Sequence, residues 1–84
     1  MVMMKSREEA IEDMTLMLMY LTCFGERSGD TIYLRTWKNY PFDVVDTLCD
    51  KDLIDTRHGN KSAYILDEGK RRAEELLKEY GIGI

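Results

Sequence analysis

The fold of this chain is decided by residues 42–69, which read FDVVDTLCDKDLIDTRHGNKSAYILDEG. Apolar residues recur with a helical period in the first half of this stretch, so we expect a helix over residues 41–53 with Pro41 at its start. Its inward side chains would be Phe42, Val45, Leu48 and Cys49. Its outer face would carry Asp43, Asp46 and Asp50, which are spaced i, i+3 and i+7. The stretch therefore opens with an amphipathic helix whose exposed side is acidic.

The second half of the same stretch predicts a hairpin and the start of another helix. Residues 54–58 and 61–66 favour strands, and Gly59-Asn60 between them fits a type II′ turn, which needs glycine first because its φ is positive. Asp67 is suited to be the N-cap of the last helix, which would end at Gly81. That helix would face the core with Ala73, Leu76, Leu77 and Tyr80.

Upstream of this stretch, the sequence predicts a long helix, a loop and a strand. Ser6 and Glu9 fit a capping box, so the helix would begin there and run to about Phe24. The polar residues 26–30 predict a loop, and residues 31–36 favour a strand.

The first helix changes character along its length. Ala10, Ile11 and Met14 are expected to point inward, whereas residues 16–24 are apolar on nearly every side and must be buried on every side. Either the helix is central in its own small domain, or part of it contacts a second copy of the chain. The interface of such a homodimer would contain Leu16, Met17, Met19, Tyr20 and Phe24. A stripe with a–d spacing, too short for a coiled coil, contains Ile11, Met14, Leu18 and Leu21.

Length and composition limit the class of protein. Eighty-four residues predict a single domain over residues 1–84. The net charge of −4 argues against nucleic-acid binding by the domain as a whole, because phosphate binding usually needs a basic surplus. The longest apolar run, residues 14–24, is too short for a membrane span and too acidic in its upstream flank for a signal peptide. We therefore expect a cytoplasmic protein without membrane association, with Cys23 and Cys49 as free thiols.

Residues 44–69 resemble the winged helix-turn-helix regulators of the PadR and MarR type. The matching residues are Val45, Leu48, Leu53, Ile54, Tyr64, Leu66, Asp67 and Gly69. The resemblance implies a winged-helix-like fold of three helices and a small antiparallel sheet, in which the β-hairpin is the wing and the 41–53 helix enters the DNA major groove. Asp52 departs from the pattern because those regulators often have glycine there, and the second helix of the motif is missing or very short.

A second resemblance involves residues 37–43 (WKNYPFD) together with residues 61–64 (KSAY). These two segments look like those of a short uncharacterised prokaryotic domain family. This resemblance implies no particular activity.

The charges divide between the helix and the wing. Residues 42–56 carry five acids against Lys51, a net charge of −4 that would repel phosphates, whereas residues 57–72 carry a net charge of +3. The candidate contacts to a nucleic acid or an acidic partner are Arg57, His58, Lys61, Lys70, Arg71 and Arg72. The same residues also fit a solvated charged surface, or a head-to-tail dimer that pairs the acidic helix with the basic wing.

No pattern in the sequence indicates catalysis or a cofactor. His58 is the single histidine and is expected at a hairpin tip, and Ser28 and Ser62 have no base nearby in the sequence. Neither a second histidine nor a CxxC pair is present to bind metal, and no glycine-rich phosphate loop occurs.

The sequence therefore predicts a winged-helix-like α+β domain that is not an enzyme. Its expected function is that of a regulatory or protein-interaction module that forms a homodimer. The alternative is a DNA-binding transcriptional regulator that contacts phosphates through the basic wing and the start of the last helix. An aromatic cluster fits either core packing or a ligand or peptide groove beside the wing, and it contains Tyr33, Trp37, Tyr40 and Phe42.

Overall fold

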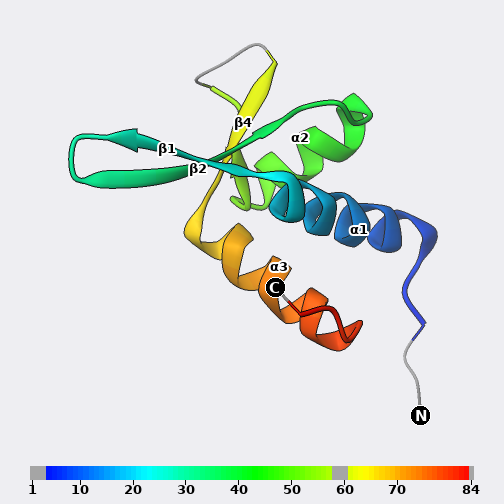
Figure 1. The fold of residues 1–84 in the computed structure, drawn as a ribbon. Coiled ribbons are helices and arrows are strands. Elements are labelled where there is room, and N and C mark those ends of the chain that lie inside the picture. The colour runs from blue at the N-terminus through cyan, green and yellow to red at the C-terminus, as the bar shows by residue number, and fades with distance from the viewer. Residues whose placement is uncertain (1–3, 58–60, 84) are drawn as a thin grey trace.

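Over residues 4–57 and 61–83, which the computed structural model describes, the chain forms three helices and a four-stranded antiparallel sheet (Figure 1). The elements follow the chain in the order α1 (Arg7–Thr22), β1 (Phe24–Ser28), β2 (Thr31–Trp37), α2 (Phe42–Asp50), β3 (Ile54–Asp55), β4 (Ser62–Ile65) and α3 (Asp67–Glu79). The strands lie side by side in the order β1-β2-β4-β3. The expected α+β class is confirmed.

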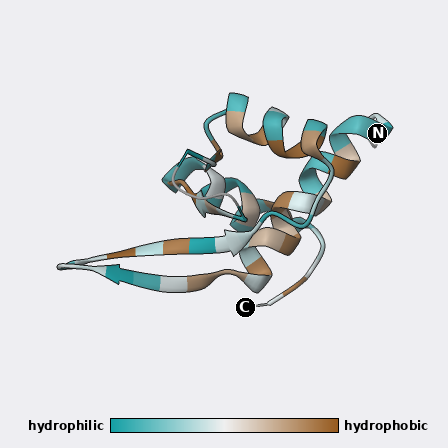
Figure 2. Ribbon diagram, turned by 90° about the horizontal axis from the view of Figure 1, so that it is seen from above, coloured by the Kyte–Doolittle hydropathy of each residue, from teal (hydrophilic) through white to brown (hydrophobic). Residues whose placement is uncertain are grey.

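The sheet has one face that is covered by the helices and one open face. Across the strands, Leu34 lies opposite Ile65, which in turn lies opposite Ile54. These side chains point to the covered face, where the core gathers. The β1–β2 hairpin projects away from the three helices (Figure 2), and hydrophobic and hydrophilic residues alternate along β2, whereas β1 ends in a run of polar residues. The outer half of this hairpin therefore leaves both of its faces uncovered.

The core is contributed by all three helices and by the covered face of the sheet. α1 packs against α3, α2 and β2. The buried hydrophobic residues are Leu16, Met17, Met19, Val45, Leu48, Ile54, Ala63, Ile65, Ala73, Leu76 and Leu77. Burial of a Leu, Ile or Met side chain contributes about 1.5–3 kcal/mol, so this cluster is the main source of stability.

Strand β1 corrects the prediction of a loop at residues 26–30. The Ser6 cap is confirmed, because its Oγ accepts from the Glu9 amide at 3.1 Å, but α1 ends at Thr22 instead of Phe24. The chain then enters β1, and Gly29 takes a φ of 62° in the turn to β2. The polar residues of β1 are compatible with a strand because their backbones pair with β2, while their side chains face solvent or each other.

The exposed side of α1 also differs from the prediction. Ile11 and Met14, expected inward, are 42% and 50% exposed. Three residues expected at a dimer interface are instead buried in the core of their own chain, namely Leu16, Met17 and Met19. They pack against α2, α3 and the sheet, so they do not form an accessible surface. Of the other two, Tyr20 is half-buried and donates its hydroxyl to Glu74, while Phe24 is 40% exposed in β1.

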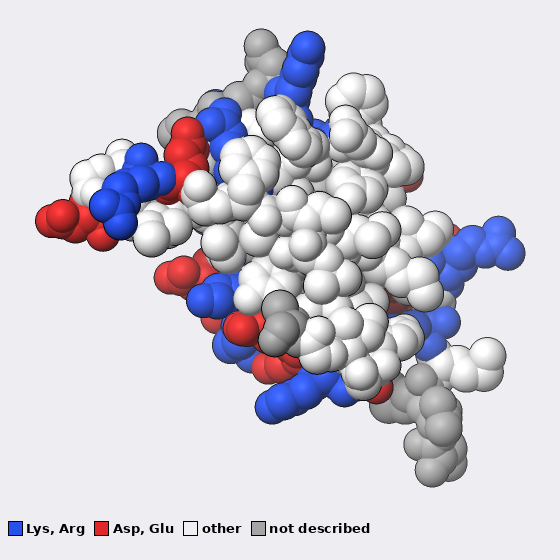
Figure 3. Space-filling model, viewed as in Figure 1, with Lys and Arg blue, Asp and Glu red and all other residues white. Residues whose placement is uncertain are grey.

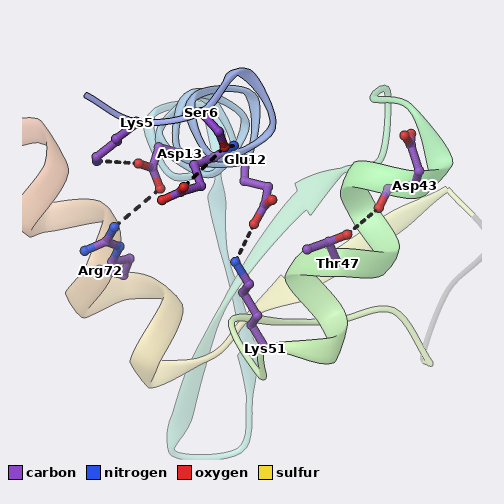
Figure 4. Close-up of polar contacts among 9 residues, drawn as sticks. Lys5, Ser6, Glu12, Asp13, Asp43, Thr47, Lys51 and Arg72 are labelled. Atoms are coloured by element: carbon purple, nitrogen blue, oxygen red, sulfur yellow. Dashed lines mark hydrogen bonds and ion pairs between the residues drawn. The ribbon is translucent and has the colours of Figure 1, made fainter. Parts of the chain in front are cut away.

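Two acids of α1 hold this helix to the rest of the domain (Figure 4). Glu12 forms an ion pair with Lys51, just after α2, and Asp13 lies 3.5 Å from Arg72 of α3. Asp13 also accepts from Lys5, and this hydrogen bond raises the pKa of the Lys5 ammonium group. Both carboxylates are mostly shielded from solvent, and they turn the acidic side of α1 toward its own chain.

Helix α2 ends earlier than predicted, and Asp52 makes its terminus. The residue has a φ of 58°, the left-handed conformation that usually calls for glycine. The next amide, that of Leu53, donates back to the Leu48 carbonyl at 3.1 Å, which completes a Schellman motif. The helix interior follows the prediction with Val45 and Leu48 buried, but Phe42 is 88% exposed and does not face the core.

We expect Asp52→Gly to stabilise the domain. Relief of the left-handed strain should increase the free energy of unfolding by about 1 kcal/mol, which raises the Tm by roughly 4–8 °C in a domain of this size. Thermal unfolding followed by circular dichroism measures the change. The control is Asp52→Ala, which removes the same charge but keeps the strain. Equal Tm values for the two variants would contradict this account.

The hairpin after α2 has shorter strands than predicted. β3 covers Ile54–Asp55 and β4 covers Ser62–Ile65, against expectations of residues 54–58 and 61–66. The type II′ turn expected at Gly59-Asn60 lies outside the described residues.

Helix α3 begins at Asp67 and is ended by a left-handed glycine. Leu66 occupies the cap position without a side-chain hydrogen bond, so the prediction of Asp67 as the N-cap is wrong, and Asp67 is the first helical residue. Gly81 has a φ of 71° and ends the helix as predicted. Ala73, Leu76 and Leu77 are buried as predicted, whereas Tyr80 is 53% exposed.

Gly69, in the first turn of α3, packs directly on the backbone that follows α2. A Cβ atom at this position would lie 2.0 Å from the carbonyl oxygen of Leu53. The same carbonyl accepts the Leu66 amide at 3.0 Å, so it belongs to the connection between sheet and helix. Only glycine permits this approach.

Substitution of Gly69 should therefore be strongly destabilising. We expect Gly69→Ala to cost about 2–3 kcal/mol of unfolding free energy, because the added methyl group forces backbone segments apart. Urea unfolding measures the loss. The matched control is Gly83→Ala, where a Cβ would meet no atom within 4 Å and the midpoint should hardly move. A wild-type midpoint for Gly69→Ala would show that the packing is not constrained as described.

Candidate binding surface

A groove lies between α2 and the segment that follows β2. Its volume is about 520 Å³, within the range of about 300–1,000 Å³ typical of ligand sites. We call it the aromatic groove, and its lining residues are Trp37, Lys38, Asn39, Tyr40, Phe42, Val45, Asp46, Thr56 and Lys61. Three residues of the aromatic cluster singled out in the sequence thus line one groove, whereas Tyr33 lies elsewhere on the sheet.

The groove is built where two separate segments of the chain meet. The amide of Lys38 donates to the carbonyl of Lys61 at 2.9 Å, which ties the end of β2 to the start of β4. The floor of the groove includes the buried Val45, while Phe42 stands almost fully exposed at its rim. Segment 37–43, which carried part of the second resemblance, therefore meets Lys61, the first residue of the other part, at this groove.

The open face of the sheet carries a polar network centred on Glu26. Its Oε1 accepts from Arg35 Nη1 at 2.8 Å, and its Oε2 accepts from the Tyr64 hydroxyl at 2.6 Å. Arg35 also donates from Nε to Ser62 Oγ at 2.8 Å. The guanidinium lies 5.5 Å from the centre of the Tyr64 ring, a cation–π distance. Residues of β1, β2 and β4 are thus held in one fixed arrangement.

Aromatic rings flank this network on both sides. Tyr33 and Tyr64 have ring centres 5.7 Å apart, and Phe24 and Trp37 have ring centres 5.6 Å apart. Trp37 is 53% exposed and also lines the aromatic groove, so the open face and the groove form one continuous surface. Tyr, Trp and Arg are the residue types that contribute most binding energy at protein interfaces.

The cations predicted to contact phosphates are largely paired within the chain. Arg57 makes a two-pronged ion pair with Asp55, with Nε and Nη2 each 3.0 Å from a carboxylate oxygen. Arg71 bonds to the carboxylates of Glu68 and Glu75 on its own helix, and its hydrogen bond lowers the pKa of Glu68.

The remaining predicted contacts lie on different parts of the molecule. Arg72 points to Asp13 of α1, Lys70 is exposed on α3, and Lys61 lines the aromatic groove. His58 lies outside the described residues. The predicted cations therefore do not converge on a single phosphate-binding surface.

The charges differ between the helices and the sheet more than between residues 42–56 and 57–72, the division predicted from the sequence. The two segments that contain the four strands, residues 24–40 and 54–65, carry five Lys and Arg against three Asp and Glu in the sequence. The rest of the chain contains seven Lys and Arg against 13 Asp and Glu. The helical part of the domain is thus strongly acidic, while the sheet and its groove are mildly basic.

Other kinds of site receive no support from the part of the chain that the structure describes. Within residues 4–57 and 61–83, no group of three His, Cys, Asp or Glu side chains is placed to hold a metal ion. No helix among these residues is long and apolar enough to cross a membrane. Cys23 and Cys49 are free thiols, and burial raises the pKa of Cys23.

The fold and surface define a small α+β domain with a projecting hairpin and a groove lined by aromatic residues. Residues 7–83 match the family described as "Domain of unknown function (DUF6429)", and the chain belongs to this family. It is 36% identical over 76 residues to "Uncharacterized protein y4hR" of Sinorhizobium fredii, a match that covers 89% of this chain and 93% of that protein. No solved structure matches it. The predicted membership of a short uncharacterised domain family is confirmed.

The hydrogen bond between Tyr64 and Glu26 makes a testable prediction about pH. This bond to a carboxylate raises the pKa of Tyr64 above its ordinary value of about 10. Because the folded pKa lies above the unfolded one, the bond stabilises the fold below about pH 10, and the stabilisation disappears as the pH rises through the folded pKa. Glu26→Gln should lower the Tyr64 pKa toward its ordinary value.

Carbon NMR titration of the tyrosine Cζ atoms measures this pKa. A Tyr64→Phe variant assigns the resonance among the five tyrosines. Tyr80→Phe, which changes an exposed tyrosine on α3, should leave the Tyr64 titration unchanged. An identical Tyr64 titration in the wild type and Glu26→Gln would refute the assigned cause.

Proposed function

We propose that this domain is a non-enzymatic protein-interaction module that binds a peptide segment of its partner in the aromatic groove. One observation carries the proposal, namely the continuous surface that joins the groove to the open face through Trp37. It combines exposed aromatic rings with a hydrophobic floor, and such rings form interface anchors because they bury a large area at a low entropy cost.

The charges of the groove indicate the kind of peptide that fits. Lys38 and Lys61 border it on one side, and Asp46 of α2 borders it on the other. A peptide with one apolar or aromatic anchor would place that side chain against Val45 and Phe42. An acidic residue beside the anchor would meet the lysines, where electrostatic complementarity favours specificity and the rate of association.

The same observations favour this function over the DNA-binding alternative. A helix that enters the major groove needs cations, but α2 exposes Asp43, Asp46 and Asp50. Arg57 and Arg71 would have to leave their carboxylate partners before they could neutralise phosphates. A winged-helix arrangement of α2, β3, β4 and α3 remains part of the proposal as a scaffold. Along the chain, the β1–β2 hairpin lies between α1 and α2, where a helix-turn-helix domain has a further helix.

Peptide selection with an intrinsic fluorescence readout tests the proposed function. A phage-displayed dodecapeptide library is panned against the purified domain, and selected sequences are synthesised. Trp37 is the single tryptophan, so its emission reports directly on the groove. We expect binding that Phe42→Ala weakens at least tenfold and that Lys61→Glu weakens for peptides with an acidic residue.

The controls separate groove binding from other contacts. Phe42 is 88% exposed, so its substitution should not change the fold. Ile32→Ala, on the projecting hairpin, should bind like the wild type. If no selected peptide depends on Phe42, the groove is not the binding site. If random duplex DNA is retarded in low salt and the double variant Arg71→Glu, Arg72→Glu abolishes this, the DNA-binding alternative replaces the proposal.

A further inference from the structure

Helix α1 presents a row of uncovered aliphatic side chains. We call it the α1 stripe, and it consists of Ile11, Met14, Leu18 and Leu21, which are 42–50% exposed. Figure 3 shows that the surface over α1 is uncharged in this view and continues toward the end of α3, with Lys, Arg, Asp and Glu confined to its borders. The sequence predicted a dimer interface made of other residues, most of them on the same helix. The stripe contains none of those predicted residues.

The spacing of the stripe is the same in both directions. Its residues are separated by three, four and three positions, so the row is symmetric about position 16. When a second α1 lies antiparallel on the first, Ile11 meets Leu21 of the second copy and Met14 meets Leu18 of the second copy. Each contact is then made twice, which is the property of a two-fold interface between identical chains.

We propose that two copies of this chain associate through the α1 stripe, with their α1 helices antiparallel across a two-fold axis near residue 16. The occupant is a second copy because the row is complementary to its own reverse. It is also aliphatic and lacks the aromatic and arginine anchors of the open face. Interfaces between permanent subunits are more apolar in this way than interfaces with exchanging partners.

Electrostatics favour the same arrangement. The helical part of the domain is strongly acidic, so two copies repel each other wherever charged helical faces would meet. The α1 stripe avoids this repulsion because Glu12 and Asp13 are turned toward Lys51 and Arg72 of their own chain (Figure 4). In the antiparallel pair the positions that meet along the stripe itself, 11 with 21 and 14 with 18, are all uncharged.

The area that a stable dimer needs is a modest share of the surface of this chain. A stable interface buries about 800 Å² on each partner, which is roughly an eighth of the 6278 Å² that this chain exposes. The stripe runs along three turns of α1, and the uncharged surface beside it extends the contact (Figure 3). None of the four stripe residues lines the aromatic groove, so the two surfaces use different side chains. The proposal does not depend on the function assigned to the groove.

Light scattering coupled to size exclusion tests the association. At about 100 µM we expect the wild-type protein to have twice the monomer mass of 9.8 kDa. Leu18→Glu should give the monomer mass with an unchanged circular dichroism spectrum, because Leu18 is half exposed. Ile32→Glu, which introduces the same charge at a more exposed site on the hairpin, should remain dimeric.

A complementation experiment tests the antiparallel pairing. Met14→Lys and Leu18→Glu should each be monomeric, but a mixture of the two should recover the dimer mass, because the new cation and anion face each other across the axis. A mixture of Ile11→Lys and Leu18→Glu lacks this match and should stay largely monomeric. A 9.8 kDa wild-type protein at every concentration, a dimeric Leu18→Glu variant, or equal recovery in both mixtures would overturn the proposal.

Discussion

The contact between Gly69 and the Leu53 carbonyl is the constraint on which the rest of this structure depends. It joins the end of α2, the sheet and the beginning of α3 at one point, where no side chain fits. Since Leu53 also accepts the Leu66 amide, the direction in which α3 leaves the sheet is set there. Ala73, Leu76 and Leu77 reach the core only because α3 starts so close to this backbone. The left-handed conformation of Asp52 ends α2 just before Leu53, whose carbonyl makes this contact.

A second consequence of this packing is the separation of the domain into two sides. The helices bring their acids together, and α1 uses two of its own to hold Lys51 and Arg72. The sheet places Arg35 and Tyr64 on the open face, where Glu26 accepts a hydrogen bond from each. The helical side and the sheet side therefore offer different chemistry. An aliphatic row suits an identical copy, and an aromatic groove with mixed charges suits a different partner.

Much of the fold could be predicted from local patterns, but the candidate site could be predicted only in part. The amphipathic rows of α2 and α3, the Ser6 cap and the terminal Gly81 act within a few residues, so their signals survive in the sequence. Strand β1 was missed because its polar residues are stabilised in a strand by pairing with β2 and by hydrogen bonds to side chains of β2 and of β4, which lies far away in the sequence. The groove was indicated by its aromatic residues, but its lysines and Thr56 are brought there by the pairing of distant strands.

By itself, the sequence determined the α+β class, the order of the helices and the strands after α2, and it left the aromatic cluster open between core packing and a groove. These depend on periodicity, caps and turn residues, which act locally. Only the tertiary structure decided which side of α1 is covered. The second half of that helix is apolar nearly all round, so its pattern contains no preferred direction, and the choice depends on where α2, α3 and the sheet pack. Burial of Leu16, Met17 and Met19 left Ile11, Met14, Leu18 and Leu21 on the surface.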